Sequence, residues 1–154
     1  MSDMSHIPEG FHRVQRPQPN PFNDLVGPFY SKLEGNVISV GLRIEERHCN
    51  SRGICHCGLL ATLADIALGY ACVIAGGTEG RAGSFVTTNL SVDYLAPAHV
   101  GDWVQSDVKV LNPGSRTATA NGFLVANGNP VVRASATFRM IKSRTPDPAS
   151  PAES

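Results

Sequence analysis

The sequence predicts an α+β domain in which an antiparallel sheet wraps around one long central helix. Residues 54–77 form a long apolar stretch in which only His56 and Asp65 readily carry a charge near neutral pH. Four segments with strand-like alternation follow, and no second long helical pattern interrupts them. A run of strands beside one buried helix is typical of the α+β class.

The overall composition fits a single globular domain. The chain has 154 residues, 42% of them hydrophobic and 17% charged, and a formal net charge of +0. Because the sequence shows no basic stripe, it predicts neither nucleic-acid binding nor attachment to a membrane surface. We expect a cytoplasmic protein with free thiols, since no apolar signal segment precedes the cysteines and three of the four lie within nine residues.

Both ends of the chain are rich in proline and poor in apolar residues. We expect residues 1–20 to form an extended or disordered arm and residues 143–154 a disordered Pro/Ser-rich tail. The folded domain is then expected to cover residues 21–142.

A short helix and a strand open the predicted domain. Asn20 before Pro21 is typical of a helix N-cap followed by proline at the first helical position, and Gly27-Pro28 disturbs that helix. In residues 37–44 every second side chain is apolar, which predicts a half-buried strand.

The long helix is predicted to begin near Cys55 and to end near Gly76-Gly77, a natural stop. Bulky apolar residues at spacings of three and four form one bulky apolar face: Leu59, Leu63, Ile66, Tyr70 and Val73. A second stripe holds small residues and one acid: Gly58, Ala61, Thr62, Asp65, Gly69 and Cys72. This stripe suits a packed interface. A membrane-spanning helix is the alternative, but a central Asp costs about 3 kcal/mol in a bilayer.

Four strands are predicted in series after the helix, over residues 84–95, 103–111, 116–125 and 131–141. In the predicted strand at residues 84–95, alternation places one set of side chains on a common side: Val86, Thr88, Leu90, Val92 and Tyr94. The predicted strand at residues 131–141 directs a second set of side chains inward: Val132, Ala134, Ala136, Phe138 and Met140. Asn112-Pro113-Gly114 and Asn127-Gly128-Asn129 mark turns between strands.

Asp65 lies in the middle of the apolar helix and is therefore expected to be partly buried. A buried carboxylate without partners is unfavourable by several kcal/mol, so it needs hydrogen-bond donors or a catalytic role. Thr62, one turn earlier, is a candidate donor. The other interpretation is a non-catalytic acid that pairs with a backbone amide or with an arginine across an interface, and the helix alone leaves both open.

His56 precedes Asp65 by nine residues, which places the two half a turn out of phase and about 13 Å apart along the axis. They cannot form a dyad within one helix, and a triad built on Cys55 or Cys57 fails for the same reason. The start of the helix offers unsatisfied backbone N–H groups that can hold an oxyanion. We expect His56 to orient this turn.

A zinc site is the rival interpretation of the same stretch. Five residues offer zinc-type ligands: His48, Cys49, Cys55, His56 and Cys57. Their spacing lacks the paired Cys-x-x-Cys pattern. We therefore expect neither a metal nor a cofactor.

The segment Asn50-Ser-Arg-Gly-Ile-Cys-His56-Cys57-Gly58, followed by Leu63-Ala64-Asp65, resembles the PaaI-type branch of hotdog-fold acyl-CoA thioesterases, which is named after a phenylacetate-degradation protein. The family pattern is an Asn, a Gly three residues later, His-Gly-Gly, and an acid nine residues after the His. Residues 89–98 and Gly101-Asp102 resemble a second, weaker block. The resemblance covers residues 21–141.

The resemblance implies a homodimer, usually doubled into a homotetramer, with active sites at the dimer interface. By analogy, Asp65 of one subunit faces Asn50 and the helix start of the other. The small-residue stripe that carries Asp65 agrees with such an interface.

The chain departs from the family at two places. Cys57 stands where the family has the first Gly of His-Gly-Gly, although a Cys retains the backbone N–H that would bind an oxyanion. Some members carry a Ser or Thr near the acid. The ungapped match here is Phe85, so Ser84 and Thr87 are both candidates, and Thr87 is expected to share a strand face with Asn89.

The resemblance implies hydrolysis of an acyl-CoA thioester to a free acid and CoA. Asp65 would act as a general base or a nucleophile, the N–H of Cys57 or Gly58 would hold the oxyanion, and Asn50 would position the water or the carbonyl. The acyl group is left open.

Because the protein has no net charge, it needs a local positive group to bind the phosphates of CoA. The expected contacts are Ser115, Arg116 and Thr117, just after a turn, with Arg81, Arg133 and Arg139 as possible helpers. A non-catalytic acyl-CoA-binding or sensor module and an acyl-CoA hydratase of the same fold are the two other functions that the sequence leaves open.

Overall fold

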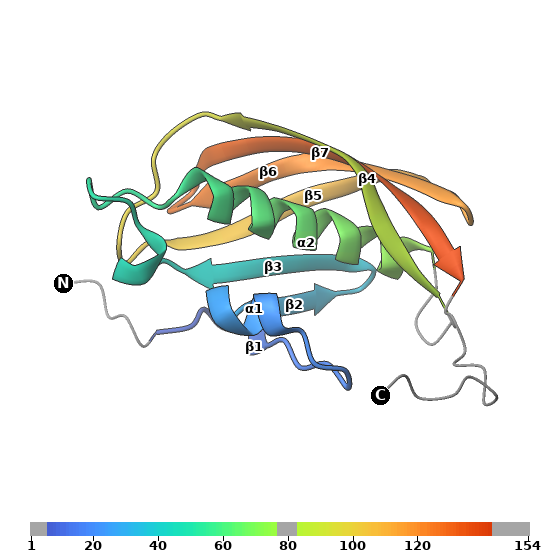
Figure 1. Cartoon of the computed structure of the whole chain (residues 1–154), viewed down its shortest axis with the longest axis horizontal. Coiled ribbons are helices and arrows are strands. Elements are labelled where there is room, and N and C mark those ends of the chain that lie inside the picture. Colours follow the sequence, from blue (N-terminus) through green and yellow to red (C-terminus); the bar gives the residue numbers. More distant parts are fainter. Residues whose placement is uncertain (1–5, 77–82, 143–154) are drawn as a thin grey trace, which may run out of the picture.

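The computed structural model describes residues 6–76 and 83–142 and shows one sheet curled around one long helix (Figure 1). The predicted α+β arrangement is confirmed. The helical elements are α1 (Pro21–Val26), the 3₁₀ turn η1 (Glu46–His48) and α2 (Cys57–Ala75). The strands are β1 (His12–Arg13), β2 (Tyr30–Glu34), β3 (Val37–Arg43), β4 (Gly83–Tyr94), β5 (Trp103–Pro113), β6 (Thr117–Ala126) and β7 (Asn129–Lys142).

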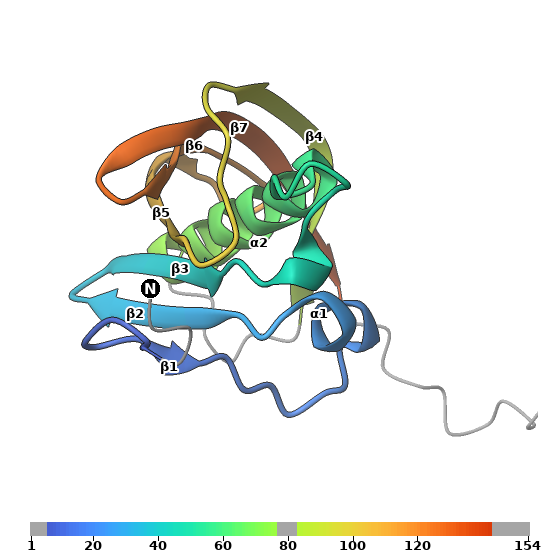
Figure 2. The same ribbon diagram turned by 90° about the vertical axis from the view of Figure 1, so that its left-hand side faces the viewer.

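The strands of the described residues form one antiparallel sheet in the order β1-β2-β3-β5-β6-β7-β4. The sheet closes over α2 from β3 round to β4, which Figure 2 shows along the helix axis. One long strand, β4, lies at an edge of the sheet and pairs only with β7. Its other edge therefore keeps backbone groups that no strand within residues 6–76 and 83–142 satisfies.

The central helix begins close to its predicted start, with His56 as N-cap, and ends at Ala75 with Gly76 as C-cap. The predicted bulky face is only partly buried: Leu63 is fully buried, whereas three others are half-buried and pack against the edge of the core, namely Leu59, Ile66 and Tyr70. The buried set contains many alanines: Leu60, Leu63, Ala64, Ala67, Leu68, Ala71 and Cys72. The sheet thus packs on three leucines with alanines between them, and the other bulky residues of α2 are half-buried.

By length and apolar composition α2 also meets the criteria for a membrane-crossing helix. The central helix of a globular domain meets the same criteria. Here the sheet covers one side of α2, and seven of its residues are buried.

The short helix α1 is confirmed with the predicted cap. Pro21 is its first residue, and the Asn23 N–H donates to Asn20 Oδ1 at 3.4 Å. The arm before it, in its described part, contributes β1, where His12 pairs with Ser31 of β2. The tail at residues 143–154 lies outside the described residues.

A β-bulge in β4 changes which side chains face the helix. Thr87 pairs with the buried Phe138, but the register shifts before Asn89, which pairs with Thr137 on the other face. Thr87 and Asn89 therefore point to opposite faces, and the expectation that they share one was wrong. The single alternation predicted along β4 fails for the same reason, because an extra residue in one strand reverses the faces beyond it.

Candidate active site

The central feature of the site is a hydrogen bond between α2 and β4. Asp65 is half-buried on the open side of α2, and Thr87 Oγ1 donates to Asp65 Oδ1 at 2.6 Å. This distance is in the short range typical of a hydroxyl donating to a charged carboxylate. Among the described residues no basic side chain pairs with Asp65. Asp65 is therefore not held in a salt bridge by any described residue of its own chain.

Asp65 opens on a cavity of about 340 Å³. Residues of three elements line it: Phe22, Asn23, Ala61, Thr62, Asp65, Ile66, Thr87 and Leu90. Thr62, the candidate donor one turn earlier, instead donates to Gly58 O at 3.0 Å. The carboxylate thus has one hydroxyl donor from the strand and an open side toward the cavity.

The start of α2 is organised by two side chains. His56 Nδ1 accepts the Gly58 N–H at 2.9 Å, which occupies one of the two expected oxyanion donors. The Tyr94 hydroxyl donates to Cys57 O at 2.9 Å. The N–H of Cys57 donates to no atom of the described residues and is left as the available donor at the positive end of the helix.

Asn50 organises the exposed loop before the helix. Its Oδ1 accepts the Arg52 N–H at 2.9 Å and the Ile54 N–H at 3.3 Å. The side-chain oxygen is thus used inside the loop. The amide NH₂ group is the part that remains for a substrate, and it can only donate.

Two of the thiols lie opposite each other in the same loop. Cys49 and Cys55 form an antiparallel bridge pair. Burial raises the pKa of Cys55 to about 12 and also raises the pKa of Cys49. Both thiols are therefore protonated near neutral pH, and a protonated thiol is a weak nucleophile.

The described residues contain no group of three or more His, Cys, Asp and Glu side chains placed to hold a metal ion.

Arg47 of η1 ties this loop to α1, a link that the sequence analysis missed. It donates to the Leu25 carbonyl at 2.7 Å and to the Gly27 carbonyl, and its Nε contacts Glu45 at 2.9 Å. The hydrogen bond from Arg47 lowers the pKa of Glu45. No pattern in the sequence marks Arg47, because its partners are mainly backbone carbonyls.

A second cavity, of about 350 Å³, lies at the start of α2. Its lining includes Phe22 and Val26 of α1, His48 and Arg47 of η1, and Gly58 of α2. His48 is buried, and burial lowers its pKa, with the nearby Arg47 charge acting in the same direction. Its Nδ1 accepts the Glu45 N–H at 2.9 Å.

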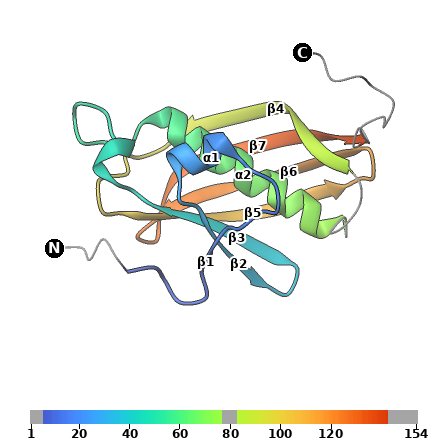
Figure 3. The same cartoon turned by 60° about the horizontal axis from the view of Figure 1, so that its bottom comes forward.

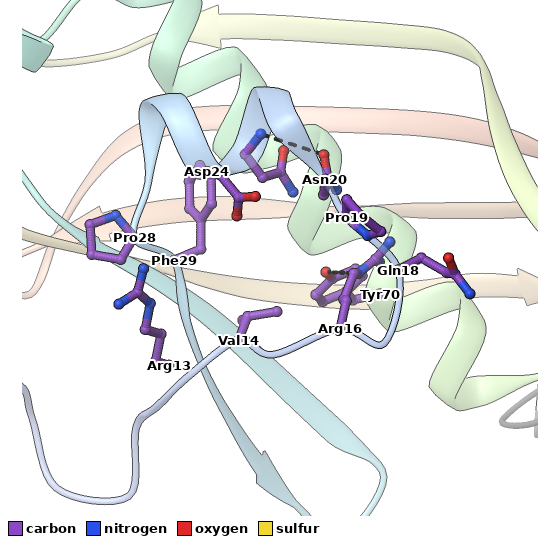
Figure 4. A pocket seen from close by; sticks show the side chains of 11 residues that line it. Arg13, Val14, Arg16, Gln18, Pro19, Asn20, Asp24, Pro28, Phe29 and Tyr70 are labelled. Carbon is purple, nitrogen blue, oxygen red and sulfur yellow. Dashed lines mark hydrogen bonds between the residues drawn. The ribbon is translucent and has the colours of Figure 1, made fainter.

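A third and smaller cavity, of about 130 Å³, lies where the arm passes α1 (Figure 4). Arg16 stacks on the Tyr70 ring, with its guanidinium carbon 4.8 Å from the ring centroid, and donates to the Tyr70 hydroxyl at 2.8 Å. Asp65 does not line this cavity, and the Arg16 guanidinium in its wall already pairs with Tyr70.

The remaining predicted site residues are dispersed. Thr87 is the hydroxyl that reaches the acid, while the Ser84 side chain lies outside the described residues. Ser115 and Arg116 lie between β5 and β6, Thr117 begins β6, and all three are exposed at the end of the sheet where α2 ends (Figure 1). Of the expected helpers, Arg133 is paired with Asp93 at 3.0 Å, and Arg81 lies outside the described residues.

Comparison with known protein sequences points to one family. The family profile described as "Thioesterase superfamily" matches residues 52–132. A Pseudomonas aeruginosa protein named "Putative esterase PA0474" is 38% identical over 138 residues, which cover 89% of this chain and 99% of that protein. Human "Acyl-coenzyme A thioesterase 13" is 32% identical over 106 residues, which cover 64% of this chain and 72% of that protein.

Solved structures show the same fold. A mutant of the phenylacetic acid degradation protein PaaI from Thermus thermophilus is 27% identical, with a TM-score of 0.64, over 78% of this chain and 98% of that one. The PaaI protein of E. coli is 20% identical, with a TM-score of 0.69, over 80% of this chain and 86% of that one.

Proposed function

The chain belongs to the thioesterase superfamily, and from this membership we propose that it hydrolyses acyl-CoA thioesters to a free acid and CoA. The predicted hotdog fold is confirmed by the antiparallel sheet on one long helix. The observation that carries the proposal is the Asp65 carboxylate, which receives the Thr87 hydroxyl, has no basic partner among the described residues and faces a cavity.

The proposed site needs two copies of the chain. Asp65 follows Cys57 by eight residues of helix, so the carboxylate and the Cys57 N–H are about 12 Å apart along the axis. One thioester carbonyl cannot reach both groups of the same chain. We propose a homodimer, with a homotetramer as a further assembly, in which the open edge of β4 faces a second copy and Asp65 meets the helix start of the partner subunit.

The proposed reaction uses Asp65 as the general base. Asp65 takes a proton from water, and the resulting hydroxide attacks the thioester carbon. The Cys57 N–H and the Asn50 amide of the partner subunit hold the oxyanion, and one such donor is typically worth about 3–4 kcal/mol in the barrier. The tetrahedral intermediate then expels CoA as a thiolate, which solvent protonates, and Asp65 releases its proton to solvent, which restores the base. Thr87 orients the carboxylate.

Direct attack by Asp65, through an anhydride, is the alternative form of the same reaction. The two forms differ in covalent chemistry on the protein. Rapid quenching of a single turnover, followed by mass spectrometry of the intact chain, distinguishes them. An anhydride adds the mass of the acyl group to the protein, whereas general-base catalysis adds nothing.

For the CoA moiety we propose Ser115, Arg116 and Thr117. Arg116 is exposed, and its side chain makes no ion pair among the described residues. A free guanidinium beside hydroxyl groups suits a phosphate. Replacement of Arg116 by Gln is expected to raise KM for acyl-CoA with little change in kcat.

The function is tested with a panel of acyl-CoA esters and detection of the released CoA. Because the chain has four free thiols, a reaction without substrate provides the background. The wild-type protein is expected to turn over, and Asp65→Asn is expected to lose at least about 100-fold in kcat, the range for removal of a general base. Stoichiometric binding of intact acyl-CoA without turnover would support a sensor module instead.

A further inference from the structure

The helix α1 lies beside the side of α2 that the sheet leaves open (Figures 1 and 3). It has no buried residue, and its two large apolar side chains are exposed, Phe22 by 56% and Leu25 by 72%. Their surroundings differ, however. Phe22 lines both cavities along α2, whereas Leu25 lines none of the cavities described above.

Phe22 stands between the Asp65 cavity and the cavity at the helix start. Only Phe22 and Thr62 line both spaces. Thr62 is small, and its hydroxyl is turned back to Gly58 O at 3.0 Å. The Phe22 ring is therefore the larger of the two side chains that separate the cavities.

The position of α1 depends on contacts to its backbone at both ends and on Val26, which is half-buried against the core. Asn20 caps its start, and Arg47 binds the carbonyls of Leu25 and Gly27 at its end. Phe22 is thus fixed at its backbone, and its ring is free to pack against a ligand. The walls around it on the Asp65 side include the apolar Ala61, Ile66 and Leu90.

We propose that Phe22 determines acyl specificity by closing the acyl end of the Asp65 cavity. This inference rests on the proposed thioesterase function. With its carbonyl at Asp65, an acyl chain extends along α2 past Ala61 and Thr62 and meets the Phe22 ring. A short chain ends before the ring. A long chain has to displace the ring to enter the cavity beyond it.

The test is the ratio of kcat/KM for lauroyl-CoA to kcat/KM for butyryl-CoA. Phe22→Ala joins the two cavities and is expected to raise this ratio by about tenfold or more, the scale for a few methylenes in an apolar pocket. Phe22→Trp fills the space and is expected to lower the ratio. Leu25→Ala, on the same helix, is the matched control and is expected to leave it unchanged.

An unchanged ratio in both Phe22 variants, or an equal fall with both esters, overturns the inference. If Phe22→Ala fails to fold, Phe22→Leu gives the same comparison with a smaller expected shift. Wild-type hydrolysis that depends on Asp65 but responds to neither Phe22 variant removes only the role of Phe22. Absence of wild-type hydrolysis of every ester removes the proposed function and, with it, this inference.

Discussion

Thr87 and Asp65 are 22 positions apart in the sequence, yet the Thr87 hydroxyl donates to the Asp65 carboxylate at 2.6 Å. The bulge immediately after Thr87 makes this contact compatible with the rest of β4. Thr87 faces the helix on one side of the bulge, and Leu90 faces it on the other, where both line the Asp65 cavity. The acid is therefore held by the edge strand, next to the surface that we propose for the second subunit.

Loss of the Thr87 hydroxyl should slow hydrolysis. Thr87→Val keeps the shape of the side chain but removes the donor, and a hydrogen bond to a charged group is worth about 1.5–3 kcal/mol. We expect kcat to fall by about tenfold or more. Thr88→Val is the control, because the Thr88 hydroxyl donates to Thr137 O and does not contact the acid. Equal rates for wild type and Thr87→Val would contradict the role of this contact.

Removal of the Cys57 backbone N–H, at the start of α2, should lower kcat more than loss of the Thr87 hydroxyl does. Cys57 is the first residue of the helix, a position where proline is well tolerated. Cys57→Pro therefore deletes the proposed oxyanion donor with little change to the helix, and kcat should fall by about 100- to 1,000-fold.

Cys57→Ala separates the backbone from the thiol. It keeps the N–H and is expected to hydrolyse acyl-CoA at close to the wild-type rate. A loss in Cys57→Ala as large as the loss in Cys57→Pro would show that the thiol itself takes part. Circular dichroism of both variants checks that α2 is intact.

The buried His48 should make stability depend on pH. Its pKa is lowered in the folded state by burial, and by the nearby Arg47, from the ordinary value of 6.5. As the pH falls below about 6.5, the unfolded chain gains a proton that the folded chain does not bind. The free energy of unfolding then decreases, by at most about 1.4 kcal/mol per pH unit for one group.

Urea unfolding at a series of pH values and fixed protein concentration measures this slope. His48→Asn keeps an acceptor for the Glu45 N–H but cannot titrate. We expect the variant to be less stable above neutral pH and to show a shallower decline in acid. The same slope in both proteins would assign the pH dependence to other groups.

Much of the framework could be predicted from the sequence because its signals are local. Asn20-Pro21 sets the start of α1, and the long apolar stretch with its glycines sets α2. Asp65 was recognised because a lone acid on such a helix is unusual. Each of these signals can be read from residues that are neighbours in the sequence.

The rest depends on contacts between distant segments. β2 was missed because its residues, Tyr30–Glu34, do not alternate, and it forms by pairing with β3. The bulge in β4 exists only in the register with β7, so no local pattern marks it. The core face of α2 was only partly predicted, because the path of the sheet decides which side of an apolar helix is covered, and the covered side includes Leu60 and Leu68 as well as Leu63.

Complementation between two inactive variants tests the shared site most directly. If each site takes Asp65 from one subunit and Asn50 from the other, a dimer of one Asp65→Asn subunit and one Asn50→Ala subunit has one intact site. Unfolding the two variants together and refolding them should restore about a quarter of the wild-type kcat, as random pairing in a two-fold dimer requires. A refolded mixture that stays as inactive as the separate variants would contradict a site built from two chains.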